Sequence, residues 1–199
     1  MVAELLDLRA IYLNGMVRMT WRFPVNAPET VHIYGVRHGA GEVSFDPRFR
    51  ITRDLRDCSS GIAFEYSGVS DVDVKKITFC VFLAERNFNS PDIRAFQSLP
   101  GCFVSVIIGR AYVRFSVKSK VSGGDFTAHM ISVRSSSTFD AGILGYAYDF
   151  NGKYMVVDLP GRIPNGVVKY PPIYLLRAIP PPVVFLIGGT NNDVIIAQY

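Results

Sequence analysis

The alternation of side chains over residues 110–121 constrains the fold of this chain more than any other feature of its sequence. Odd positions carry Ala, Val, Phe, Val, Ser and Val, whereas even positions carry Arg, Tyr, Arg, Ser, Lys and Lys. Because successive side chains of a β-strand point to opposite faces of the sheet, this register gives one apolar face and one basic face. It predicts a long antiparallel strand that is buried on one side and open to solvent on the other.

Short apolar runs separated by turn residues extend this pattern over most of the chain. Asn14 with Gly15, and Asn151 with Gly152, each join two such runs, and this dipeptide is a strong signal for a two-residue β-hairpin. We expect strands at residues 8–13, 16–23, 30–36, 49–53, 62–66, 76–84, 103–108, 110–121, 127–134, 144–150, 153–159, 174–178, 183–187 and 194–198. The sequence therefore predicts an all-β protein.

One interruption of this pattern divides the chain near its middle. Ser90 and Pro91 suit the start of a short helix, and Pro100 with Gly101 would end it. We therefore expect two tandem antiparallel β-sandwiches joined by a short helix-containing linker. The first is expected at residues 1–89, the linker at 90–101 and the second at 102–199; one larger sandwich is the alternative.

Residues 17–24 and 32–36 resemble the second and third strands of a fibronectin type III domain, in which a tryptophan precedes a proline and the next strand carries a tyrosine. Trp21, Pro24 and Tyr34 occupy these places, and residues 77–87 are similar to a later strand of that family. Phe79 stands where the family usually has a tyrosine, so the tyrosine-corner hydrogen bond would be missing. The resemblance covers residues 6–88 and extends to immunoglobulin-like sandwiches in general. It implies a scaffold for binding or spacing, without catalytic residues.

The basic residues are concentrated in the second half of the chain. Residues 1–95 contain 12 basic and 12 acidic residues, whereas residues 96–199 contain 9 and 5, so the second part supplies the whole net charge of +4. Charged residues make up 19% of the chain, below the roughly 25% of soluble proteins. Either a partner or a second copy covers part of the surface, or uncharged polar residues occupy the outer faces.

The basic face of the 110–121 strand is a candidate anion-binding site. Its cations are Arg110, Arg114, Lys118 and Lys120. A solvated face or a charge-protected edge strand accounts for the same residues without a ligand, and is the simpler interpretation. Only one aromatic residue lies among these cations, so nucleic acid is not the expected partner.

A second candidate site consists of tyrosines around the Asn151 turn. Tyr146 and Tyr148 share one face of a predicted strand, and Tyr154 follows the turn. An exposed face would offer a stacking platform for a sugar or a protein. Asp149 lies on the opposite face of the predicted strand and prefers water. This favours the interpretation that the tyrosines face inward and belong to the core.

Residue types that carry chemistry do not form a recognisable motif. The histidines His32, His38 and His129 lack metal-ligand spacing, and so do Cys58, Cys80 and Cys102. Cys80 sits in an apolar run and is expected to be buried. Asp71 and Asp73 have the spacing of calcium-loop ligands but lack the closing glutamate. We therefore expect no metal and no cofactor.

Taken together, these patterns indicate a non-catalytic binding or assembly module, with a protein partner or self-association. A carbohydrate-binding accessory module is the alternative, and a carbohydrate-active hydrolase is a more remote one. No export signal is visible, the cysteine number is odd, and no apolar run has the length of a membrane span. These features favour a cytoplasmic location.

Overall fold

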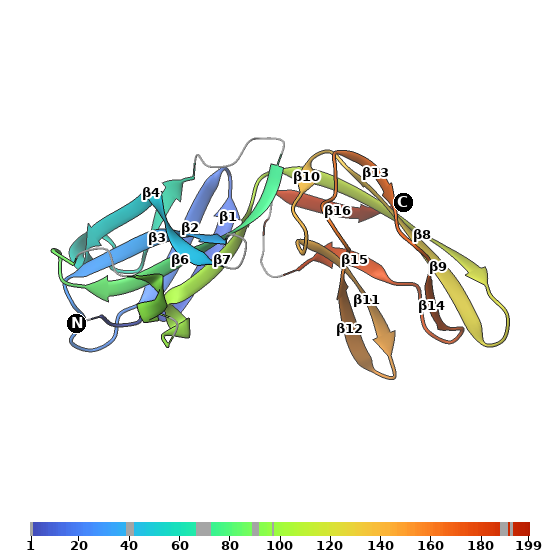
Figure 1. Ribbon diagram of the computed structural model, residues 1–199, viewed down its shortest axis with the longest axis horizontal. Coiled ribbons are helices and arrows are strands. Elements are labelled where there is room, and N and C mark those ends of the chain that lie inside the picture. The colour runs from blue at the N-terminus through green and yellow to red at the C-terminus, as the bar shows by residue number, and fades with distance from the viewer. Residues whose placement is uncertain are drawn as a thin grey trace. The chain divides into compact units, whose positions relative to one another are not determined.

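The computed structural model describes residues 2–38, 42–66, 73–88, 92–96, 98–187, 191 and 193–199. The chain is all-β, as predicted, and divides into two compact units (Figure 1). The first unit consists of Met1–Tyr66 and Ile77–Val106, and the second of Ser67–Lys76 and Ile107–Tyr199. Residues 67–76 therefore group with the second unit, and the segment predicted as a linker groups with the first.

Two antiparallel sheets make up the first unit. One has the order β1-β2-β5, formed by β1 (Leu6–Leu13), β2 (Met16–Arg22) and β5 (Gly61–Glu65). In the other, β3 (Thr30–His38) lies between β4 (Val43–Asp54) and β6 (Asp73–Ala84), and β6 also pairs with β7 (Phe103–Ile108) and with the two-residue β10 (Thr138–Phe139). The predicted hairpin at Asn14 is confirmed, because Asn14 and Gly15 have φ angles of 54° and 81°, as a two-residue turn requires.

Aromatic side chains fill the space between these two sheets. Trp21 is buried, and its Nε1 donates a hydrogen bond of 3.2 Å to the carbonyl oxygen of Cys58. Phe79, fully buried, contacts Phe64 and Phe49, with ring centroids 5.7 and 5.4 Å away. Phe49 of β4, Phe64 of β5 and Phe79 of β6 thus connect the two sheets through one aromatic cluster.

The predicted helix over residues 90–101 is wrong. Its described part contains two 3-10 turns, η2 (Ile93–Phe96) and η3 (Pro100–Cys102), whereas Ser90 and Pro91 lie outside the described residues. Pro100 opens the second of these turns, where its missing amide proton is tolerated. Phe96 is buried instead against Phe82, with ring centroids 4.5 Å apart, so this segment covers the second face of the β3–β6 sheet.

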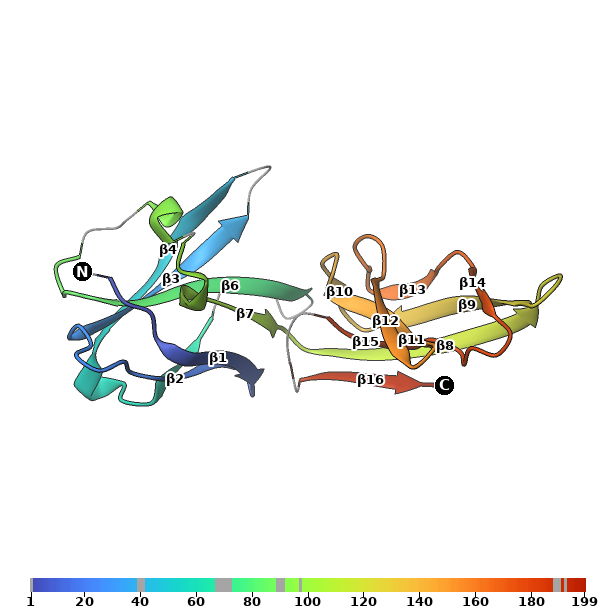
Figure 2. The same cartoon turned by 90° about the horizontal axis from the view of Figure 1, so that it is seen from below.

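The second unit also contains two sheets (Figure 2). The longer one consists of β8 (Ala111–Val121), β9 (Phe126–Ser135), β13 (Gly166–Lys169), β14 (Ile173–Leu176) and β16 (Val194–Gln198). Its strand order is β13-β9-β8-β16, and β14 also pairs with β9. The shorter one has the order β12-β11-β15, from β11 (Leu144–Phe150), β12 (Lys153–Asp158) and β15 (Val183–Leu186). The sequence patterns missed β13 and the two-residue β10 (Thr138–Phe139), which pairs in parallel with Asp73 and Val74.

The core of the second unit lies between its sheets. Val113 and Phe115 of β8 and Val133 of β9 pack in one cluster with Leu144 of β11 and Val184 of β15. These residues occupy only one face of the longer sheet. The opposite face, which we call the outer face, is left to solvent.

Candidate functional site

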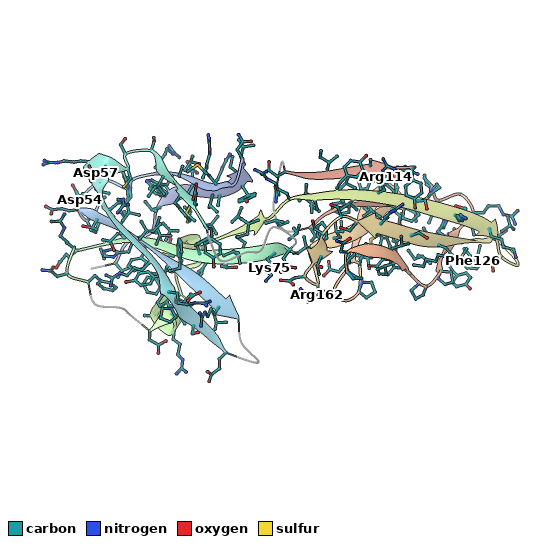
Figure 3. All side chains as sticks on the ribbon, turned by 90° about the horizontal axis from the view of Figure 1, so that it is seen from above. Asp54, Asp57, Lys75, Arg114, Phe126 and Arg162 are labelled. Carbon is teal, nitrogen blue, oxygen red and sulfur yellow. The ribbon has the colours of Figure 1, made fainter. Side chains whose placement is uncertain are left out.

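Strand β8 alternates between core and solvent, as the sequence predicted. Val113 and Phe115 are buried, whereas Arg114, Lys118 and Lys120 are exposed. Arg114 lies on the β8 segment beside β16 (Figure 3). The structure therefore places three of the four predicted basic residues on the outer face, where no described segment of the unit covers them.

Neighbouring strands add further cations and apolar side chains to this outer face. Arg134 of β9 lies directly opposite Arg114, and Val167 of β13 lies opposite Arg134. The exposed charged residues of the face are Arg114, Lys118, Lys120, Arg134 and Lys169, and its exposed large apolar residues are Tyr112, Phe126, Met130, Val167, Tyr174, Leu176 and Ile195. Only the β8 part of this face follows from the sequence, because the other strands reach the face through pairing that a single sequence does not reveal.

The electrostatic character of the outer face is uniform. Strands β8, β9, β13, β14 and β16 contain no aspartate or glutamate, and none of the five cations forms an ion pair with another described residue. Arg110 differs from them, since its Nε lies 3.7 Å from the Asp193 carboxylate. The predicted set of four cations thus contains one partly neutralised member and three that are free to attract an anionic partner.

Arg114 and Tyr112, two side chains of the outer face, contact each other. The guanidinium carbon of Arg114 lies 5.2 Å from the centroid of the Tyr112 ring, a cation–π distance. Tyr112 also lines a pocket of about 270 Å³ together with Arg134, Ser135, Ser136, Asn165 and Gly166. This pocket gives the face a recess beside its charged rows.

The predicted tyrosine platform does not assemble as one surface. The rings of Tyr146 and Tyr148 stack with centroids 6.3 Å apart, and Tyr146 packs against the core. Tyr154 pairs with Asp149, which has the opposite parity, so it lies on the other face of the hairpin and is exposed. Only Tyr146 and Tyr148 are brought together.

One histidine and the three cysteines, residue types that often carry chemistry, lie buried in the protein. His32 is fully buried against Phe82, and Cys58, Cys80 and Cys102 are buried free thiols. Burial raises the pKa of Cys102 to about 12, helped by the nearby Glu4 carboxylate, so this thiol is not reactive at neutral pH. Among the described residues, no group of three or more histidine, cysteine or acidic side chains is arranged to hold a metal.

The pair of aspartates with calcium-like spacing is only partly described. Asp71 lies outside the described residues, as do Gly39 and Gly41 beside His38. Asp73 forms ion pairs with Lys75 and Arg162, at 3.5 and 3.6 Å (Figure 3). Lys75 and Arg162 therefore already neutralise the carboxylate of Asp73.

A serine and a histidine that no sequence motif linked lie in contact on the β8–β9 hairpin. The hydroxyl of Ser119 is 2.8 Å from Nδ1 of His129, and the buried Nε2 of His129 has no hydrogen-bond partner among the described residues. Burial lowers the pKa of His129, which keeps the ring neutral. No described carboxylate orients this imidazole, so the pair lacks the third member of a catalytic triad.

Two pockets at one end of the first unit have mixed charge. Their volumes are about 440 and 460 Å³, and they share Glu29 and Arg86. Arg86 forms an ion pair of 2.6 Å with Asp54, which lies near Asp57 at this end (Figure 3). Arg86 and Asp54 thus neutralise each other within the unit, in contrast to the unpaired cations of the outer face.

The fold and the site define an all-β protein with two sheet-built units, one of which exposes a basic and apolar sheet face. The sequence matches no protein-family model and no curated protein. Among the described residues there is no helix with the length and apolar character needed to cross a membrane.

Proposed function

We propose that the chain is a non-catalytic binding module whose outer face on the second unit binds an acidic protein partner. The observation that carries this proposal is the combination of five cations without ion pairs and seven large exposed apolar side chains on one sheet face. Large apolar side chains gathered on one exposed sheet face often mark an interaction site, and Arg, Tyr and Met are enriched in protein interfaces. Uniform positive charge selects a partner of opposite sign and speeds its association.

A protein explains this face better than a nucleic acid or a glycan. Val167, Leu176 and Ile195 are aliphatic and offer nothing to a phosphate backbone or a base. They would be covered by the apolar side chains of a protein surface, while Arg114 and Arg134 would meet its carboxylates. A sugar platform at the second candidate site would require tyrosines on a common exposed face, and Tyr154 lies apart from Tyr146 and Tyr148.

For the first unit we propose the role of a scaffold that resembles a fibronectin type III or immunoglobulin-like sandwich. Its strands β1–β7 lie in two sheets, and Trp21 of β2 is buried. Sandwich domains of this architecture serve widely as spacers and binding scaffolds.

Fluorescence anisotropy with three labelled probes tests the proposal. The probes are an amphipathic peptide with alternating Glu and Leu or Phe residues, a single-stranded oligothymidylate and a heparin oligosaccharide. We expect the acidic peptide to bind in a salt-sensitive manner, and the double variant Arg114→Ala/Arg134→Ala to lower its affinity at least tenfold. Each substitution removes one charge-assisted contact, worth about 1.5–3 kcal/mol.

The double variant Arg9→Ala/Arg18→Ala is the matched control. It removes two exposed cations from the sheet β1-β2-β5, which also carries Asp7 and Glu65, and should leave peptide affinity unchanged. Equal loss in both double variants would mean general charge attraction and overturn the proposal. Preferred binding of the oligothymidylate or of heparin, with the same dependence on Arg114, would replace the protein partner by that polyanion.

A further inference from the structure

Strand β12 is an open sheet edge on a different surface of the second unit. Among the described residues it pairs only with β11, and the β11–β12 hairpin projects away from the other strands of its unit (Figure 1). All six of its residues, Lys153–Asp158, are exposed. The strand is therefore accessible along its free edge and on both faces.

The register of the hairpin tells which backbone groups face the open edge. In a two-residue turn the flanking residues, here Phe150 and Lys153, exchange hydrogen bonds, and the pattern then alternates. The amide of Leu159 donates to the carbonyl oxygen of Leu144 at 2.9 Å, as expected if every second pair from Phe150–Lys153 onward is hydrogen-bonded. Odd residues of β12 therefore bond to β11, and the amides and carbonyls of Tyr154, Val156 and Asp158 point outward.

Features that normally protect a sheet edge are missing from this strand. It contains no proline, its pairing with β11 has no bulge, and its two charges stand at its ends. Between them lie Tyr154 and Val156, 79% and 54% exposed, together with Met155 and Val157. A regular apolar strand with three outward-facing residues is a template for another strand.

We propose that β12 pairs with β12 of a second copy of this chain, in antiparallel orientation with Val156 on the two-fold axis. This register pairs every outward-facing residue: Val156 with itself, and Tyr154 with Asp158 of the second copy. Each such pair exchanges two backbone hydrogen bonds. Met155 then lies opposite Val157 of the second copy, which closes an apolar contact on the other side of the ladder.

The charges of the strand favour a second copy in this orientation. Antiparallel pairing brings Lys153 of one copy to the end of the ladder that carries Asp158 of the other. Parallel pairing would put like charges together at both ends, which is destabilising. The same patch on both copies is self-complementary, as a two-fold interface requires.

Because two six-residue strands form only a small interface, the association should be weak and reversible. Sedimentation equilibrium over a range of protein concentrations measures it directly. We expect a monomer–dimer equilibrium for the wild-type chain, weakened at least tenfold by Val156→Pro or Val156→Lys. Since the amide of Val156 faces the open edge, proline removes an intermolecular donor and leaves the pairing with β11 in place.

Val121→Lys is the matched control, because Val121 ends β8 with 61% exposure and the substitution adds the same charge elsewhere. It should dimerise like the wild type. A wild-type chain that stays monomeric at all concentrations, or an unchanged dimer in both Val156 variants, would overturn the proposal. The result is independent of the acidic-peptide assay, in which Val156→Pro should bind the peptide normally.

Introduced cysteines test the register. The three native thiols are buried, so a new surface cysteine is the reactive one. Residues on the two-fold axis face each other within the Cα separation that a disulfide requires, whereas those one position away lie beyond about 7 Å. Val156→Cys should therefore form a cross-linked dimer on mild oxidation and Met155→Cys should not; efficient cross-linking of Met155→Cys alone would exclude this register.

Discussion

Arg114 and Arg134 lie directly opposite each other on the adjacent antiparallel strands β8 and β9, and both are exposed. Like charges in such a cross-strand pair repel, and neither has a carboxylate partner among the described residues. The isolated chain therefore carries a local electrostatic cost at the centre of its outer face. The acidic partner proposed above would relieve this cost by placing carboxylates between the two guanidinium groups.

Arg134→Glu should stabilise the isolated protein and abolish binding of the acidic peptide. The substitution converts the repulsive pair into an attractive one, worth about 0.2–1 kcal/mol in each direction. Urea denaturation at low salt should give a higher free energy of unfolding than for the wild type. The gain should shrink in high salt, because exposed charges are then screened.

Lys169→Glu is the control for this prediction. It changes the net charge equally on the same face, but Lys169 lies opposite Ser132 and has no cation across from it. An equal gain in both variants would show that the effect comes from net charge alone and not from the Arg114–Arg134 pair.

Phe96→Ala should destabilise the first unit by about 3–5 kcal/mol, because it leaves a cavity beside Phe82 and Phe45. The ring is almost completely buried although its segment has only a single turn of 3-10 structure. The free energy of unfolding from chemical denaturation checks this. Phe150→Ala, at an exposed ring, should cost far less, and equal costs would mean that the segment containing Phe96 is not part of the core.

The fold class could be predicted from the sequence because it depends on local alternation and turn chemistry. Residues 110–121 and the Asn14 and Asn151 turns were placed correctly, since side-chain parity and positive φ at Asn-Gly are properties of a few consecutive residues. The helix over residues 90–101 was predicted from start and stop signals, which say nothing about tertiary burial. Phe96 is needed against Phe82, and that contact decides the conformation of the segment.

The candidate site could be predicted only in part. The exposed face of β8 follows from its own sequence, whereas Arg134, Val167 and Ile195 join it through strand pairing over long sequence distances. The phase of the hairpin separates Tyr154 from Tyr146 and Tyr148, although all three are close in sequence. The two-residue turn that the sequence predicts at Asn151 already fixes this register, because it places Tyr154 opposite Asp149, so this separation follows from the turn length.

Asp46→Asn should destabilise the β3–β4 hairpin. Burial alone would raise the pKa of Asp46, but hydrogen bonds from Arg48 and Arg37 lower it to about 2. Its ion pair with Arg37 measures 2.8 Å, and loss of a hydrogen bond to a charged group costs about 1.5–3 kcal/mol. The free energy of unfolding at pH 7 measures this cost, with Asp125→Asn in an exposed turn as a control that should change little. Equal effects of the two substitutions would contradict the prediction.

Gly61→Ala should destabilise the protein more than Gly124→Ala. Both glycines have positive φ angles, 146° and 72°, so both substitutions strain the backbone by about 1–2 kcal/mol. At Gly61 the new methyl group would also collide with the carbonyl oxygen of Met19, whereas nothing lies within 4 Å at Gly124. Thermal denaturation of the two variants compares them, and a similar loss in both would mean that β5 can move away from β2.

Acidification should weaken the first unit through His32. Burial is the main cause that lowers the pKa of His32 below its ordinary value of 6.5, and the positive charge of Arg50 lowers it further. A hydrogen bond to the Glu85 carbonyl raises this pKa but does not outweigh the burial. The unfolded chain therefore binds a proton more readily than the folded one, and stability is lost as the pH falls below about 6.5. Asp46 does not contribute in this window, because its own contribution is lost only as the pH falls below the ordinary carboxyl pKa of 3.8 towards its lowered pKa of about 2.

Denaturation of the wild type and of His32→Asn at pH 7.5, 6.5 and 5.5 tests this assignment. The wild type should lose stability over this range, and the variant should lose less, because asparagine does not titrate. The remaining slope of the variant is expected from His129, whose pKa is also lowered by burial. Identical slopes for the two proteins would mean that His32 is protonated without cost, which is incompatible with its complete burial against Phe82.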